Sequence, residues 1–159
     1  MKMKTTCLLI AAFILISFTV PKGNAANSVD SAGLAEAKNI IENNEKFVLK
    51  NLKAIKEKND IIQKNWIKWK GYKGIDKIRE QLKKIRQNVI NAERASGTIY
   101  NYADKHNYNK AKYKNLKDYL TIVKMQYDRM MEYKYEKLES LNPGKNYIEY
   151  TDKAISLIK

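Results

Sequence analysis

The chain has 159 residues, with 31 lysines and arginines against 17 acidic residues, so its net charge is +14 at neutral pH. Its single cysteine excludes a framework of internal disulfides, and its single histidine excludes the paired Glu-x-x-His motifs of di-iron helical bundles. A chain of this length can bury one modest apolar core, which predicts a single domain stabilised by side-chain packing.

The N-terminal residues have the pattern of a secretory signal peptide. Lysines at positions 2 and 4 precede an apolar stretch at 7–20, which Pro21 ends. The stretch is shorter than the ~20 residues of a membrane-spanning helix, so we expect no stable membrane anchor. Small residues predict cleavage after Ala25, with Ala26 as the alternative. Residues 1–25 are therefore predicted as the signal peptide, and 26–159 as one helical domain that is secreted, or periplasmic in a bacterium.

The predicted mature chain has no thiol, because Cys7 lies within the signal peptide. Removal of Lys2, Lys4 and Lys22 leaves 28 basic residues against 17 acidic ones, a net charge of +11. This excess favours a partner that is anionic or has acidic patches. The alternative is that the charge only keeps a small exported protein soluble.

The first predicted helix extends from Leu34 to Lys70, roughly 55 Å at 1.5 Å per residue. Asp30 and Ser31 are its candidate capping residues. Large apolar residues recur in it at a spacing of seven: Leu34, Ile41, Val48, Ile55, Ile62 and Trp69. Gly71 and Gly74 predict a turn after this helix, because glycine tolerates the backbone angles of helix ends.

The second predicted helix has apolar residues at alternating spacings of three and four: Ile75, Ile78, Leu82, Ile85, Val89 and Ala92. We expect it to pack back against the first helix, and we expect at least a kink at Ser96–Gly97. The polar run 104–109 is predicted as a connecting turn.

The third predicted helix has the same spacing in a further set of residues: Tyr113, Leu116, Leu120, Val123, Tyr127 and Met130. It continues through Leu138 and Leu141 and ends at Asn142–Pro143–Gly144. A short fourth helix follows, so the sequence predicts an all-α antiparallel bundle of three long amphipathic helices plus a short C-terminal helix.

No motif for catalysis is recognisable in the sequence. It has neither a phosphate-binding glycine loop nor a Gly-x-Ser-x-Gly elbow. Ala103, rather than glutamate, lies three residues before the only histidine, His106, which is expected to be solvent-exposed or hydrogen-bonded within the fold. The alternative for His106 is proton exchange or ligand contact. We therefore predict a protein that is not an enzyme and that has no cofactor or metal.

Lysines gather on the side of the first helix opposite its apolar row. We call this set the basic ridge, and it comprises Lys46, Lys50, Lys53, Lys64 and Lys68. The basic ridge predicts an electrostatic track for phosphate, sulfate or an acidic protein surface. The alternative is an ordinary solvated helix face.

The end of the first helix combines aromatic and basic residues. The predicted partner-binding residues there are Lys64, Trp66, Lys68, Trp69, Lys70, Tyr72 and Lys73. Aromatic rings offer large contact areas, and lysines orient an anionic partner. The alternative is that the two tryptophans close the end of the core.

Ten of the eleven tyrosines lie between Tyr100 and Tyr150. We expect their rings either to pack at the edge of the core or to stack on rings of a partner.

The leader followed by a small helical body rich in lysine, asparagine and tyrosine resembles secreted salivary-gland effectors and venom-type proteins of insects. This resemblance is one of layout and transfers no site residue. We predict a secreted, non-enzymatic effector that binds a host macromolecule, expected to be a protein with an acidic surface. Nucleic acid is not expected as a partner unless the protein is delivered into another cell. The alternatives are a carrier of an apolar or amphipathic small molecule and a membrane-active amphipathic protein.

Overall fold

The computed structural model of the protein describes residues 25–69, 74–132 and 143–159. Within these ranges the chain is helical apart from short turns and contains no strand, which confirms the all-α fold class. The helices are α1 (Ala25–Trp69), α2 (Ile75–Lys84), α3 (Arg86–Lys105), α4 (Lys110–Glu132) and α6 (Pro143–Ile158).

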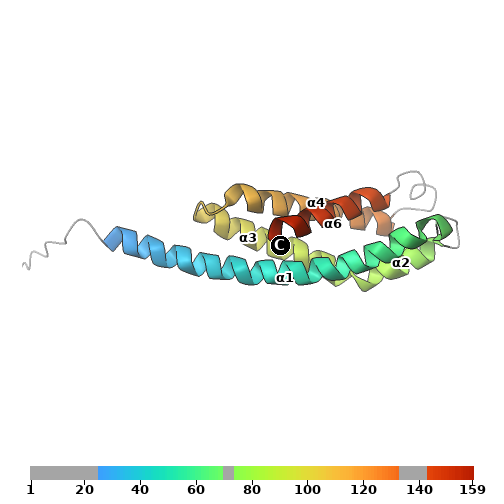
Figure 1. Ribbon diagram of the computed structural model, residues 1–159, viewed down its shortest axis with the longest axis horizontal. Coiled ribbons are helices and arrows are strands. Elements are labelled where there is room, and N and C mark those ends of the chain that lie inside the picture. Colours follow the sequence, from blue (N-terminus) through green and yellow to red (C-terminus); the bar gives the residue numbers. More distant parts are fainter. Residues whose placement is uncertain (1–24, 70–73, 133–142) are drawn as a thin grey trace, which may run out of the picture.

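The helices pack side by side in an elongated body (Figure 1). Helix α1 contacts α3 and α6, and α4 contacts the same two helices. Helix α2 contacts α1, and it continues in the direction of α3. One continuous apolar core fills the space between the helices, and it includes Leu52 of α1, Leu82 of α2, Ile99 of α3, Leu120 of α4 and Tyr147 of α6.

Helix α1 begins at Ala25, well before the predicted start at Leu34. The prediction that Asp30 and Ser31 cap this helix is wrong, because both residues lie within it. Its first turns are rich in alanine, which has the highest helix propensity, and contain no proline. Figure 1 shows these turns extending past the turn that joins α3 to α4.

Helix α3 does not end at Ser96–Gly97, where at least a kink was predicted, and the chain breaks its helix at Ile85. At Ile85 the backbone angles are φ −109° and ψ 7°, and its N–H donates to the Leu82 carbonyl over 3.1 Å. The Tyr127 hydroxyl donates to the same carbonyl over 3.1 Å, so the break is stabilised by a side chain from α4. Ser96 is fully buried within α3 and donates to the Glu93 carbonyl over 2.7 Å.

The predicted turn between the second and third helices is present at residues 106–109. Asn107 has a φ of 49°, and its N–H donates to the Asp104 carbonyl over 3.2 Å. The Tyr108 N–H donates to the Ala103 carbonyl over 2.8 Å. This pair of bonds is the Schellman arrangement, in which asparagine substitutes for the usual glycine at the left-handed position.

Helix α6 has Pro143 as its first residue, a position where the missing N–H costs no hydrogen bond. The predicted continuation of the third helix through Leu138 and Leu141 lies outside the described residues. So do residues 70–73 of the predicted glycine turn. Gly74 is described, and a Cβ at this position would overlap the Trp69 backbone, so the close approach requires glycine.

Candidate binding surface

The five lysines of the basic ridge are all exposed. None of them forms an ion pair with a carboxylate in residues 25–69, 74–132 or 143–159. Elsewhere lysines are paired across helices, as Lys112 of α4 is with Glu45 of α1 at 2.8 Å. An anionic partner can therefore approach the basic ridge without breaking an existing ion pair.

Acidic residues divide the basic ridge into two groups. At about 100° per residue, Glu57 falls in the middle of the ridge sector and Asp60 at its edge, and both are exposed. The first group, Lys46 to Lys53, therefore precedes these two carboxylates, and the second group, Lys64 and Lys68, follows them. Both carboxylates are already paired, Glu57 with Lys58 and Asp60 with Lys56. This alternation is visible in the sequence, but the ridge prediction overlooked it.

The predicted patch at the end of α1 is described only in part. Lys64 and Lys68 are exposed, whereas Trp69 is half-buried and packs against the core. Trp69 thus contributes to closing the core end, as the alternative interpretation predicted. The Trp66 side chain, Lys70, Tyr72 and Lys73 lie outside what the structure describes. Ile67, which the prediction omitted, is 83% exposed between the two lysines.

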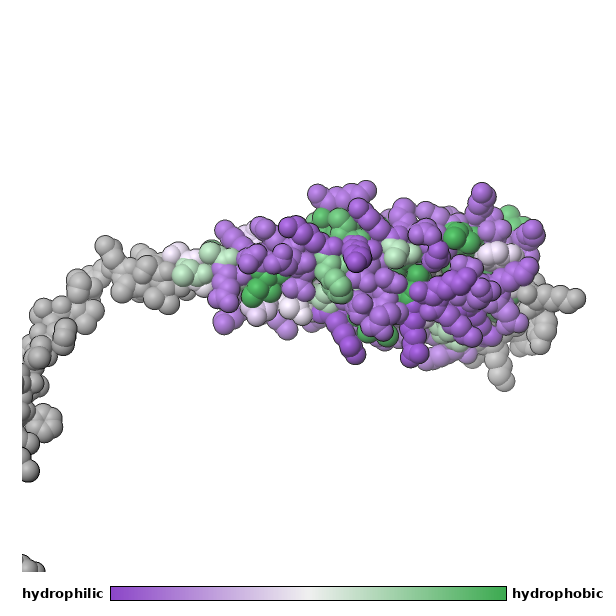
Figure 2. Space-filling view, turned by 90° about the horizontal axis from the view of Figure 1, so that it is seen from below, coloured by the Kyte–Doolittle hydropathy of each residue, from purple (hydrophilic) through white to green (hydrophobic). Residues whose placement is uncertain are grey.

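Phe47 is a second exposed apolar side chain, and it precedes the buried Val48 of the apolar row. It is 45% exposed, and its helix neighbours Lys46 and Lys50 are exposed as well. Figure 2 is seen from the side on which α1 lies in Figure 1, and it shows small hydrophobic areas within a predominantly hydrophilic surface.

Tyrosine rings and lysines interact mainly within the protein. Lys117 lies 4.8 Å from the centre of the Tyr100 ring, and Lys38 lies 5.1 Å from that of Tyr108. Such pairs are favourable cation–π contacts. Tyr108 is also one of several tyrosines that pack half-buried against the core. These rings therefore have a structural role that accounts for the interleaving of tyrosine and lysine in the sequence.

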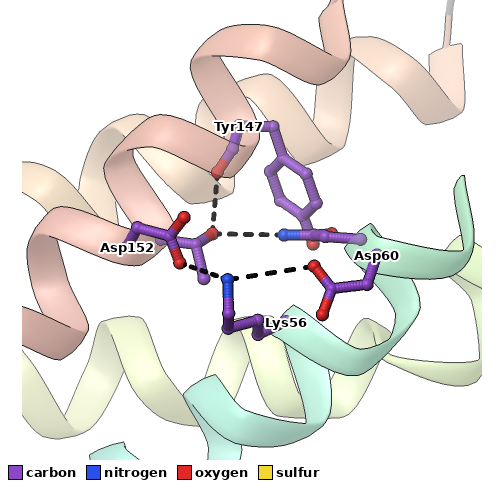
Figure 3. Close-up of polar contacts among 6 residues, drawn as sticks. Lys56, Asp60, Tyr147 and Asp152 are labelled. Carbon is purple, nitrogen blue, oxygen red and sulfur yellow. Dashed lines mark hydrogen bonds and ion pairs between the residues drawn. The ribbon is translucent and has the colours of Figure 1, made fainter. Parts of the chain in front are cut away.

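A polar cluster joins α1 to α6 inside the bundle (Figure 3). The Asn59 amide donates to the Thr151 hydroxyl over 3.4 Å, and that hydroxyl donates to the Tyr147 carbonyl over 2.7 Å. At its margin Lys56 pairs with Asp152 at 2.7 Å and with Asp60 at 3.8 Å. The hydrogen bond with Asp152 raises the pKa of Lys56 above its ordinary value.

Two atoms of this cluster, the Tyr147 hydroxyl and the Asn59 Oδ1, are buried without a hydrogen-bond partner among the described residues. Burial raises the pKa of Tyr147 well above its ordinary value, so the phenol stays neutral. The cluster therefore joins α1 to α6 through hydrogen bonds and an ion pair.

Surface hollows lie beside two groups of polar residues. One of about 480 Å³ is bordered by Arg86, Tyr127 and Asp128, among others, and it combines both signs of charge. Another of about 370 Å³ is bordered by His106 and Leu34 at the opposite end of α3. His106 is half-buried, near Gly33 of α1. No group of three metal-binding side chains occurs in the described part of the chain.

None of the described helices is both long and apolar enough to cross a membrane. Comparison with models of protein families, with curated proteins and with solved structures found no match to this chain.

Proposed function

We propose that this protein is a secreted, non-enzymatic effector that binds an acidic macromolecule, a host protein with an acidic surface, through the lysine-rich face of α1. The observation that carries the proposal is the state of the basic ridge, in which five exposed lysines have no carboxylate partner among the described residues. Unpaired charges of one sign accelerate and orient the approach of a partner of the opposite sign.

The proposal includes the likeness to insect salivary-gland and venom-type proteins, a signal peptide at 1–25 and one domain at 26–159. It also includes the antiparallel arrangement of three long helices and a short one, with α2 and α3 together forming the second long helix. No cofactor is part of this function. The exposed Ile67 at the end of α1 supports an additional apolar contact beside Lys64 and Lys68.

A pull-down from extract of the tissue that receives the secretion tests the proposal. The test variant carries Lys46→Glu, Lys50→Glu and Lys53→Glu on α1. A matched control carries the same change at three exposed lysines of α2 and α4, namely Lys77, Lys83 and Lys114.

The original protein and the control are expected to capture the same partner, and the α1 variant is expected to lose it. Equal capture by all three proteins would show that these lysines of the basic ridge do not bind the partner. Equal loss in both variants would show that net charge alone determines binding.

A further inference from the structure

Helix α6 can separate from the bundle without breaking the contacts between the other helices. Its main contacts are with α1 and α4, whereas α1 also packs against α3, and α3 against α4. Figure 1 shows α6 beside α4, on the opposite side of the body from α2. Removal of α6 would therefore leave the α1–α3 and α3–α4 contacts in place.

The contact between α6 and α1 has a polar centre that is only partly hydrogen-bonded (Figure 3). The Asn59 amide lies 3.4 Å from the Thr151 hydroxyl, which is longer than an ordinary N–H···O bond. The Asn59 Oδ1 and the Tyr147 hydroxyl are buried, and neither has a hydrogen-bond partner within the described ranges. Both groups give up hydrogen bonds to water when α6 closes, and opening would restore them.

The contact between α1 and α3 also buries an asparagine, but that side chain is fully bonded. Asn51 donates to the Phe47 carbonyl over 2.8 Å and accepts from Asn88 over 3.0 Å. Of the two buried asparagines of α1, Asn59 is therefore the one left short of a partner, and it faces α6. The polar centre thus weakens the α6 contact relative to the α3 contact.

The margin of the α6 contact adds little to its strength. Lys56 pairs with Asp152 at 2.7 Å, but the two side chains are 42% and 49% exposed. Water and salt screen an ion pair that is exposed to this degree. Helix α6 is therefore held mainly by the apolar side chains that it buries, namely Tyr147, Ala154 and Ile155.

We propose that α6 is a strap that opens while α1, α3 and α4 remain folded. Such a partial opening has a lower free energy than global unfolding, because fewer apolar contacts are lost. It exposes the buried side chains of α6 and the sides of α1 and α4 that they cover. The inference goes beyond the proposed function, because it concerns the interior side of α1 and not the basic ridge.

Hydrogen exchange of the full-length protein, followed by mass spectrometry, tests the strap. The central amides of α6, 147–154, should exchange about tenfold or more faster than the buried amides of α3. Tyr147→Phe removes one unpartnered hydroxyl and should slow the exchange of α6 about fivefold or more. Ile99→Val in α3 should speed the exchange of α3 about fivefold and leave that of α6 unchanged, because α6 opens without α3.

A covalent link between α1 and α6 provides a second measurement. In a chain with Cys7→Ser, the changes Lys56→Cys and Asp152→Cys are joined by a short bis-maleimide. The link should slow the exchange of α6 to the rate of α3. The matched control is the same variant with both thiols capped by N-ethylmaleimide, and it should retain fast exchange in α6.

Three results would overturn the proposal. The first is equal exchange of α6 and α3 in the original protein. The second is an α6 whose exchange rises together with that of α3 in Ile99→Val, because both helices would then open only by global unfolding. The third is a cross-link that leaves the exchange of α6 unchanged.

Discussion

Tyr127 and Tyr147 are buried tyrosines with opposite hydrogen-bonding states, so removal of each hydroxyl should have opposite effects on stability. The Tyr127 hydroxyl donates to the Leu82 carbonyl at the helix break over 3.1 Å. The Tyr147 hydroxyl is buried and has no partner among the described residues. Tyr→Phe removes one oxygen in each case and preserves the ring.

The expected magnitudes follow from these two states. Tyr127→Phe loses one hydrogen bond and should destabilise the protein by about 1 kcal/mol. Tyr147→Phe removes a desolvated donor with no compensating bond and should stabilise it by about 1 kcal/mol or more. The two variants should therefore differ in free energy of unfolding by at least about 2 kcal/mol, with opposite signs.

Urea unfolding followed by circular dichroism measures both values, provided that the slopes with denaturant agree. The unmodified protein is the reference, and the double variant should show additive effects if the two hydroxyls act independently. A Tyr147→Phe variant that loses as much stability as Tyr127→Phe would refute the assignment of an unpartnered hydroxyl between α1 and α6.

Burial raises the pKa of Tyr113, Tyr127 and Tyr147, so above about pH 10 the unfolded chain releases protons that the folded state keeps. Above that pH, the free energy of unfolding should fall by up to about 1.4 kcal/mol per pH unit for each of them, and the fall should be smaller in Tyr147→Phe. A free energy of unfolding that stays constant from about pH 9 to 11 would contradict this. Gly74→Ala should destabilise the protein by about 1–3 kcal/mol, because the added Cβ meets the Trp69 backbone. Gly97→Ala should stabilise it by up to about 1 kcal/mol, because this glycine lies in mid-helix and open space surrounds its Cβ position. Thermal unfolding compares the two, and equal shifts would exclude the close approach at Gly74. Asn107→Ala should lower the free energy of unfolding by about 1 kcal/mol, because alanine is strained at the φ of 49° found here, whereas Asn107→Gly should not lower it. In the same melting assay, a loss of stability in both variants would contradict the Schellman assignment.

The helices could be predicted from the sequence because their apolar residues recur at spacings of three and four over many turns. The rows containing Leu82 and Leu120 are buried, as that spacing predicts. The break at Ile85 could not be predicted, since the apolar spacing continues through it and the Tyr127 hydroxyl that bonds to it is distant in sequence. The helix does not end at Ser96–Gly97, and the Ser96 hydroxyl finds its acceptor inside α3.

The candidate surface was predictable where it depended on residue type and angle around one helix. The five ridge lysines are exposed, as their position opposite the apolar row predicts. The exposure of Phe47 was not predictable. An apolar residue beside the buried row of α1 is covered only where another helix lies against it, and the sequence of α1 does not show where that occurs. Residues 70–73 of the predicted aromatic patch lie outside the described ranges, so that part stays a prediction.

The polar contacts between α1 and α6 join residues more than ninety positions apart, such as Asn59 with Thr151 and Lys56 with Asp152. Tyr147, Ala154 and Ile155 of α6 also supply part of the buried apolar interior. A chain emerging from the ribosome therefore lacks one wall of its interior until synthesis has passed Ile155. Contacts of such long sequence separation form late, because their loop-closure entropy must be overcome first. This order leaves the growing polypeptide without a closed interior until α6 has been synthesised.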